Sequence, residues 1–169
     1  MRRCGLQKEV AVSNSDDARS VVARWYTALA AGDVDGVVAG FHPDVVASVI
    51  GSTPVSGRFK GRDAFLAGTL GVVFDSLDPG QTRFAKTWSV FAVDGQRVVG
   101  LMTGDAVAKN GRPYNSIYCQ LFTIGDGQIV EYLEFVDTVV VEAALFDNPL
   151  VRPSEMRREP MTITDLVSR

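Results

Sequence analysis

The chain has 169 residues, of which 46% are hydrophobic and 22% are charged, so it is long and apolar enough for one globular domain with a buried core. Its net charge is −3, it has no basic stripe and no apolar run of membrane-spanning length, so we expect neither nucleic acid nor a membrane as partner. Two cysteines, Cys4 and Cys119, are too few for a disulfide framework, and the first residues lack the apolar segment of a secretory signal, which together favour a cytoplasmic location.

The sequence predicts one domain over residues 15–146, between two irregular ends. Residues 1–14 show no helical or strand periodicity, and we expect them to form a flexible arm. Residues 147–169 are rich in proline and arginine, and we expect an irregular tail. The folded unit is therefore expected to lie in the middle of the chain.

The first part of this domain predicts three helices. The spacing of one helix face, i, i+3, i+4 and i+7, is occupied by apolar residues at Val22, Trp25, Tyr26 and Leu29. Further helices are predicted over 33–41 and 61–77 by the same spacing. Between them we expect a turn at 42–44, a β-branched strand over 45–50 and a loop over 51–60.

The second part predicts a meander of four antiparallel strands over 81–137. Asn110-Gly111 is a strong signal for a two-residue hairpin loop, because both central residues of a type I′ turn need positive φ. Asp94-Gly95 and Gly125-Asp126-Gly127 are expected to close the other two hairpins. Residues 139–146 either prolong the last strand or form a short helix. Helices followed by such a sheet indicate an α+β fold with the helices on one face, which encloses a cone open at its mouth.

Loop lengths decide which side chains share the face toward the helices. With two-residue loops at the first two turns and a three-residue loop at the last, three charged side chains lie on that face, namely Lys86, Asp105 and Glu134. A two-residue loop at the last turn would instead flip the final strand and leave Glu134 solvated. The sequence alone leaves this alternative open.

The rest of the predicted site is apolar, aromatic or neutral. We expect the substrate to contact Trp25, Tyr26, Phe41, Trp88, Thr103, Tyr118, Gln120, Phe122, Tyr132 and Val136. The opposite face of the sheet is predicted to carry Ile117, Cys119, Leu121, Leu133 and Phe135. Because this second set is apolar, we expect a homodimer that associates through the outer sheet face.

Two carboxylates in an apolar cone would each disfavour the charged form of the other. Asp105 and Glu134 could then divide the work, one as acid and one as base, as epoxide opening requires. Lys86 beside Asp105 could hold it ionised; the alternative is that Lys86 extends into water and that Asp105 is a rim residue satisfied by Ser116. With no metal-ligand spacing and no phosphate-binding glycine loop, we expect neither metal nor cofactor.

Three other polar residues are expected to have structural roles. Asp137 lies near the end of the last strand on the opposite parity, so it is predicted to be structural. His42 precedes Pro43 and is predicted to cap a turn or lie at the surface. Asn115 is predicted to support its hairpin. None of the three is therefore placed in the site.

Residues 21–46, 61–74 and 111–137 resemble the nuclear-transport-factor-2-like (NTF2-like) superfamily, which includes SnoaL-like polyketide cyclases, ketosteroid isomerases and limonene-epoxide hydrolases. The resemblance extends over roughly residues 20–145 and implies a cone of three helices packed on a curved antiparallel sheet. It also implies an apolar small-molecule substrate.

Compared position by position, Asp105 and Glu134 fall on the two carboxylates of the epoxide-hydrolase type, and Thr103 on the arginine that bridges them. The tyrosine and asparagine that hold the attacking water in that type fall on Ala47 and Val49. The resemblance is therefore closer to polyether-type epoxide-opening cyclases, which work with an Asp/Glu pair.

The ketosteroid-isomerase site matches less well, because its base falls on Val49, its helix tyrosine on Trp25 and its oxyanion-hole aspartic acid on Gln120. Three functions thus follow from the sequence. The first is an acid–base enzyme that opens epoxides of apolar molecules. The second is a SnoaL-like cyclase or isomerase that moves a proton next to a carbonyl, and the third is a non-catalytic ligand-binding or assembly module.

Overall fold

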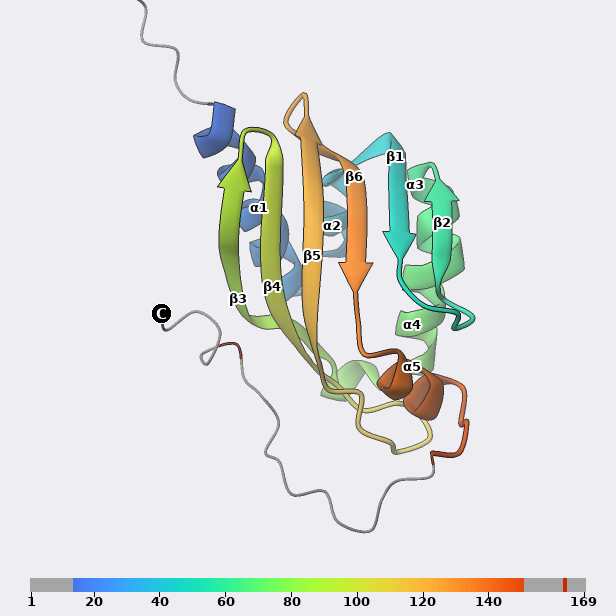
Figure 1. Cartoon of the computed structure of the whole chain (residues 1–169). Coiled ribbons are helices and arrows are strands. Elements are labelled where there is room, and N and C mark those ends of the chain that lie inside the picture. Colours follow the sequence, from blue (N-terminus) through green and yellow to red (C-terminus); the bar gives the residue numbers. More distant parts are fainter. Residues whose placement is uncertain (1–13, 151–162, 164–169) are drawn as a thin grey trace, which may run out of the picture.

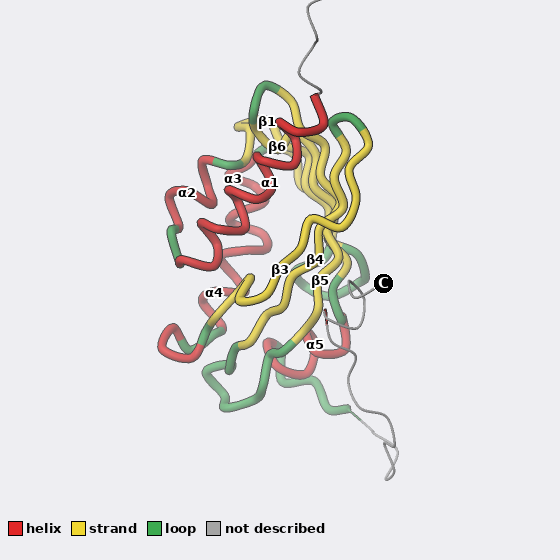
Figure 2. The backbone as a smooth tube through the Cα atoms, turned by 90° about the vertical axis from the view of Figure 1, so that its left-hand side faces the viewer, coloured by secondary structure: helices red, strands yellow, loops and turns green. Residues whose placement is uncertain are grey.

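The computed structural model describes residues 14–150 and residue 163, so the predicted arm and most of the predicted tail lie outside the described residues. Figure 2 shows the N-terminal helices on one side of a single curved sheet, as an α+β fold requires. The helical elements are α1 (Asn14–Ala31), α2 (Val34–Ala39), α3 (Arg62–Phe65), η1 (Leu66–Leu70), α4 (Gly71–Ser76), η2 (Pro79–Gln81) and α5 (Thr138–Leu145).

The sheet has six strands in the order β2-β1-β6-β5-β4-β3 (Figure 1). Their bounds are β1 (Phe41–Val49), β2 (Gly57–Lys60), β3 (Arg83–Asp94), β4 (Arg97–Asp105), β5 (Ser116–Gly125) and β6 (Gln128–Phe135). The predicted meander corresponds to β3–β6. The prediction of a loop over 51–60 was wrong at its end, because β2 forms there and pairs antiparallel with β1. On its other side, β1 pairs parallel with β6. β2 is short and mostly exposed, so it lacks the apolar alternation that predicts a strand.

The predicted helices are present, and their apolar stripes face the sheet. α1 buries Val22, Trp25 and Tyr26 against it. Asp33 caps α2, its Oδ1 accepting from the Gly36 N–H at 2.9 Å. The third predicted helix is continuous in direction but contains the π-helical segment η1, which the spacing did not predict. Within the described residues, no helix is long and apolar enough to cross a membrane.

The β4–β5 connection is one residue longer than predicted, and this changes the register. The Ala108 N–H donates to Arg112 O and the Gly111 N–H donates to Ala108 O, both at 2.8 Å, so three residues, 109–111, form the loop. Gly111 has φ +83°, as in a turn that ends in a left-handed residue. Opposing residue numbers therefore sum to 220 rather than 221, so every β4 side chain lies on the face opposite to the one predicted.

A bulge in β3 corrects the parity of that strand. The β3–β4 loop is Gly95-Gln96, one residue later than predicted. Phe91 is an extra residue between the Val90–Gly100 and Ala92–Val99 pairs, and this one-residue bulge changes the parity. Trp88 then pairs with Met102 and Phe84 with Gly104, and residues 85–87 oppose Thr103 alone, a second bulge whose two extra residues leave the parity unchanged. Both aromatic side chains therefore still face the helices.

The β5–β6 turn has the two-residue loop that was expected to turn Glu134 outward, because Gly125 pairs with Gln128. Val130 is an extra residue in β6, however, and this bulge restores the parity beyond it. Glu134 consequently lies opposite Gln120 on the helix-covered face. The predicted inward orientation is confirmed, although a bulge rather than a longer loop produces it.

Two glycines of β4 make room for tyrosines on the helix-covered face. A Cβ atom on Gly100 would lie 2.2 Å from the Tyr26 Oη, and one on Gly104 would lie 2.9 Å from the Tyr118 ring. Any larger residue would displace these rings. The floor of the cone thus depends on glycine at two β4 positions, on either side of Met102.

Candidate functional site

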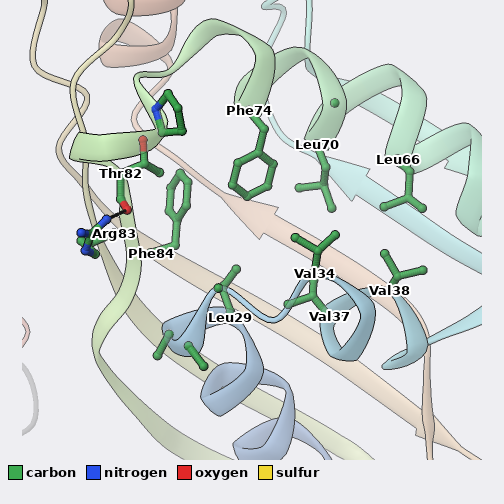
Figure 3. Close-up of a pocket in the computed structure, with 15 residues that line it drawn as sticks. Leu29, Val34, Val37, Val38, Leu66, Leu70, Phe74, Thr82, Arg83 and Phe84 are labelled. Carbon is green, nitrogen blue, oxygen red and sulfur yellow. Dashed lines mark hydrogen bonds between the residues drawn. The ribbon is translucent and has the colours of Figure 1, made fainter.

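A cavity of two adjoining chambers lies between the helices and the sheet. The outer chamber has a volume of about 570 Å³ and opens between the α1–α2 turn, α4 and the start of β3 (Figure 3). The inner chamber has about 50 Å³ and extends to β5 and β6. Five apolar residues line both chambers and form what we call the neck: Leu29, Val37, Leu70, Phe74 and Phe84.

Among the described residues, Glu134 is the one charged residue that lines the inner chamber, and it is half-buried. Its neighbours in the lining include Tyr114, Tyr118 and Tyr132. All four tyrosines of the chain are buried. The polar side chains of this interior are therefore Glu134, the tyrosines, Gln120 and Thr69, whose hydroxyl donates to the Val55 O at 3.0 Å.

Hydrogen bonds fix one oxygen of Glu134. Gln120 Nε2 donates to Glu134 Oε2 at 2.9 Å and to Tyr132 Oη at 2.8 Å, and the Tyr132 hydroxyl donates to the same Oε2. Tyr26 Oη completes the network by donating to Gln120 Oε1 at 2.6 Å. Among the described residues, none donates to the second oxygen, Oε1. The network thus orients the carboxyl while leaving one of its oxygens for another group.

Burial controls the protonation of these groups. Burial raises the pKa of Glu134 above its ordinary value, and the hydrogen bonds from Tyr132 and Gln120 oppose that shift without cancelling it. Burial also raises the pKa of Tyr114 to about 12 and the pKa values of Tyr118 and Tyr132 well above their ordinary value. The phenols therefore stay protonated donors near neutral pH, while Glu134 can exchange a proton.

The hydroxyl of Tyr118 is buried in the inner-chamber wall and, among the described residues, makes no hydrogen bond of normal geometry. The Tyr114 hydroxyl is the nearby group that it can approach as a weak donor. A buried hydroxyl without a partner costs roughly 1–3 kcal/mol. Such a donor beside Glu134 is suited to receive an oxygen atom of a bound molecule.

The predicted pair of carboxylates is not brought together. Asp105 pairs with Arg83 in the β3–β4 register and lies on the open face, with its side chain 58% exposed. Lys86 lies on the β3 bulge, 69% exposed, and its Nζ is 3.8 Å from an Asp105 oxygen. Both were expected in the cone, and that placement was wrong: the three-residue β4–β5 loop turns Asp105 outward, and Lys86 lies in the 85–87 bulge of β3. Their ion pair is a solvated surface pair.

Thr103 also turns away from the cavity. Its Oγ1 lies 3.2 Å from the Thr87 N–H, which donates to it across the β3 bulge. The prediction that it lines the substrate site was therefore wrong, for the same reason of register. Its hydroxyl instead replaces a missing backbone contact at the bulge.

The other predicted binding residues divide into lining and support. Four line the inner chamber: Trp25, Phe41, Tyr118 and Tyr132. The remainder lie behind them in the core, namely Tyr26, Trp88, Gln120, Phe122 and Val136. Trp88 stacks on Tyr26 with ring centroids 5.2 Å apart, so it supports the hydrogen-bond network from behind.

Several lining residues were not predicted as part of the site. They are Leu29, Val37, Leu66, Leu70, Phe74, Arg83, Phe84, Met102 and Tyr114. Most are apolar residues of helices, which periodicity assigns to the core without separating core from cavity wall. Phe84 was predicted on the correct face, and Met102 follows from the corrected register.

The three polar residues expected to be structural have local roles. Asp137 caps α5, because its Oδ1 accepts from the Val139 and Val140 N–H groups at 2.9 and 3.2 Å. His42 Nδ1 accepts from the Asp44 N–H at 3.1 Å, and Asn115 Oδ1 accepts from the Ala106 N–H at 3.0 Å, which supports its hairpin. Within the described part of the chain, no group of three or more His, Cys, Asp or Glu side chains is arranged to hold a metal ion.

The SnoaL-like domain family matches residues 22–132, from within α1 to β6. No functionally curated protein matches the chain. The fold is found in solved structures, among them an NTF2-like protein of unknown function from Burkholderia pseudomallei. That protein is 23% identical with a TM-score of 0.65, and the alignment covers 76% of this chain and 97% of that one.

Two further similar structures have more informative descriptions. TerC, co-crystallised with polyporic acid, is 23% identical with a TM-score of 0.62, over 77% of this chain and 98% of that one. An LEH-like epoxide hydrolase of M. tuberculosis is 21% identical with a TM-score of 0.55, over 79% and 92%. At these identities the likeness shows the NTF2-like fold alone.

Proposed function

Because this chain belongs to the SnoaL-like domain family, we propose that it is a cofactor-independent enzyme that moves a proton next to a carbonyl group of an apolar small molecule. The observation that carries the proposal is the single carboxyl group of Glu134, oriented by hydrogen bonds at the base of an otherwise apolar cavity. A carboxyl group in such surroundings has a raised pKa, which makes its ionised form a stronger base.

The proposed step uses two groups of the inner chamber. The free oxygen of ionised Glu134 takes a proton from the carbon next to the carbonyl, the C–H electron pair moves into the new C=C bond, and the carbonyl oxygen becomes an enolate oxygen. Tyr118 Oη, which makes no hydrogen bond of normal geometry among the described residues, donates a hydrogen bond to that oxygen as its negative charge develops. In a ketone with a β,γ C=C bond the intermediate is a dienolate: Glu134 returns the proton to the γ-carbon, the carbonyl re-forms and the C=C bond ends between the α- and β-carbons, which is an isomerisation. In a ketone without that bond the proton returns to the α-carbon, and the reaction is proton exchange alone.

Epoxide opening by a carboxylate pair has weaker support, because Asp105 lies on the open face. Epoxide opening with Glu134 as the acid is nevertheless a second candidate, since its raised pKa favours the protonated form that would donate to the departing oxygen. In that reaction, the attacking hydroxyl would need a base that the described cavity lining does not supply. Proton transfer next to a carbonyl requires only the groups present.

The test incubates the purified protein in D₂O with a panel of apolar ketones and a panel of apolar epoxides, followed by ¹H NMR. We expect exchange or migration of the α-proton in at least one ketone, and a loss of about 100-fold or more in Glu134→Gln. Glu131→Gln is the matched control, because Glu131 lies on the same strand but is exposed. Ketone binding without exchange, or full activity in Glu134→Gln, would contradict the proposal.

A further inference from the structure

The two chambers differ in size, and this difference decides which part of a ligand each can take. The inner chamber has about 50 Å³, less than the volume of two water molecules in the liquid, so it has room for about two or three non-hydrogen atoms. A carbonyl group with one hydrogen or methyl substituent fits this space, whereas a six-membered ring does not. The outer chamber, at about 570 Å³, is in the range of small-molecule pockets. The body of the ligand must therefore lie in the outer chamber, with its carbonyl end inserted through the neck.

The inner chamber offers polar side chains to such a carbonyl group. Among the described residues, Tyr118 Oη makes no hydrogen bond of normal geometry, and Glu134 Oε1 accepts none. Other polar side chains of this chamber are already engaged, because Thr69 Oγ1 donates to the Val55 O at 3.0 Å and the Tyr132 hydroxyl donates to Glu134 Oε2. A carbonyl oxygen therefore finds an available donor at this end of the cavity.

The side chains of the outer chamber offer no comparable group. Thr82 and Arg83 are the two residues of its lining with polar side chains. Thr82 Oγ1 donates to the Asp78 O at 2.6 Å, so its proton is already used. Arg83 pairs with Asp105 in the strand register, so its side chain lies on the open face of the sheet, on the other side of β3 from Phe84. An oxygen atom on the body of the ligand would therefore lose hydration without gaining a side-chain donor, which is unfavourable.

The neck and the mouth are apolar as well. Phe74 and Phe84 meet edge to face at the neck, with ring centroids 5.5 Å apart (Figure 3). Nearer to solvent, Val34 and Phe74 both line the outer chamber and are 70% and 45% exposed. A slender hydrocarbon chain can thus contact apolar side chains all the way from the neck to the mouth.

We propose that the substrate is an open-chain compound with one carbonyl group at the end of an apolar chain, that is, a methyl ketone or an aldehyde. The carbonyl oxygen lies at Tyr118, the chain carbon next to the carbonyl lies at Glu134, and the rest of the chain passes the neck into the outer chamber. The identity of the reacting carbon rests on the proposed function, whereas the preference for a terminal carbonyl rests on the two chambers and can be tested separately. A carbonyl in mid-chain would require the inner chamber to hold a second chain, and a ring ketone would require it to hold part of a ring.

The test compares the binding of three nine-carbon ketones by isothermal titration calorimetry: nonan-2-one, nonan-5-one and 4-propylcyclohexanone. The first two have the same formula and differ only in the position of the carbonyl group. We expect nonan-2-one to bind about tenfold more tightly than each of the other two, because only its carbonyl group reaches Tyr118. Equal or tighter binding of either of the other ketones would overturn the proposal.

Three variants locate the preference for nonan-2-one. Tyr118→Phe should weaken the binding of nonan-2-one about tenfold and leave that of nonan-5-one unchanged, since only the first ketone uses the hydroxyl. Leu70→Trp narrows the neck and should also weaken the binding of nonan-2-one, whereas Phe135→Ser on the open face should keep both affinities. An unchanged preference in Tyr118→Phe would overturn the proposal.

The same ketones separate this inference from the proposed function. Glu134→Gln should keep the preference for nonan-2-one, because the carbonyl oxygen is held by Tyr118. A preference for nonan-2-one without proton exchange would refute the proposed function alone. Proton exchange in ketones without that preference would refute this inference alone.

Discussion

At the scale of single residues, the chemistry of the cavity depends on how Glu134 is held. Tyr132 and Gln120 both donate to one carboxyl oxygen, and the other oxygen has no donor among the described residues. Gln120 is itself held by Tyr26. Removing a member of this network should therefore change both the orientation and the protonation of the carboxyl group.

The raised pKa of Glu134 predicts how stability depends on pH. At a pH between the ordinary pKa near 4.5 and the higher folded-state pKa, the Glu134 carboxyl group is ionised in the unfolded chain and protonated in the folded chain. The contribution of protonated Glu134 to the free energy of unfolding is therefore complete below about pH 4.5. It is lost as the pH rises through the folded-state pKa, and the free energy of unfolding falls by about 1.4 kcal/mol per pH unit between the two pKa values. Urea unfolding at several pH values should show this decline in the wild type and a flatter profile in Glu134→Gln. Parallel profiles would contradict the shift.

Tyr118→Phe should separate stability from activity. The substitution removes a buried hydroxyl that has no hydrogen-bond partner, so we expect unchanged or higher stability, by up to about 1 kcal/mol, and at least about tenfold slower turnover. Tyr132→Phe is the matched control, because its hydroxyl has two partners and its loss should cost about 1 kcal/mol. Urea unfolding and the exchange assay measure both effects. A destabilised but fully active Tyr118→Phe would contradict the assigned role.

At the scale of elements, the sequence predicted the helices, the meander and the positions of its turns, because periodicity and turn residues are local signals. It could not predict loop lengths to one residue. The loop at 109–111 has three residues, and this alone moved Asp105 out of the site. The bulges at 85–87 and at Val130 have no sequence signature. In the first of them, Ala85 adopts a positive φ of 51° although it is not glycine, asparagine or aspartate, the residues that usually indicate such a backbone.

The small residues of β4 predict a second effect at this scale. In Gly100→Ala, the new Cβ would lie 2.2 Å from the Tyr26 Oη and would push that hydroxyl away from Gln120. We expect a loss of roughly 1–3 kcal/mol in the free energy of unfolding. In Gly80→Ala the nearest atom is an Asp78 oxygen at 3.3 Å, so this control should change stability by less than about 0.5 kcal/mol. Equal effects in the two variants would contradict the role of Gly100.

At the scale of the whole molecule, the helices leave one face of the sheet open. Leu121 and Phe135 on that face are 38% and 42% exposed, and Cys119 pairs with Phe135 across β5 and β6. The homodimer expected from the sequence stays a prediction. Size-exclusion chromatography with light scattering should give a dimer for the wild type and a monomer for Phe135→Glu. Val139→Glu, on α5 and 50% exposed, should remain dimeric. A monomeric wild type would contradict the expectation.

The central claim is that Glu134 is a buried carboxyl group poised to exchange a proton, and an NMR titration tests it without a substrate. The protein would be labelled with ¹³C at the glutamate side-chain carboxyl carbon and titrated from acid to neutral pH, with Glu134→Gln to assign its signal. We predict one signal that titrates clearly above the ordinary value of 4.5 and is missing from the variant. If the signal that the variant lacks titrates at or below 4.5, the claim is wrong.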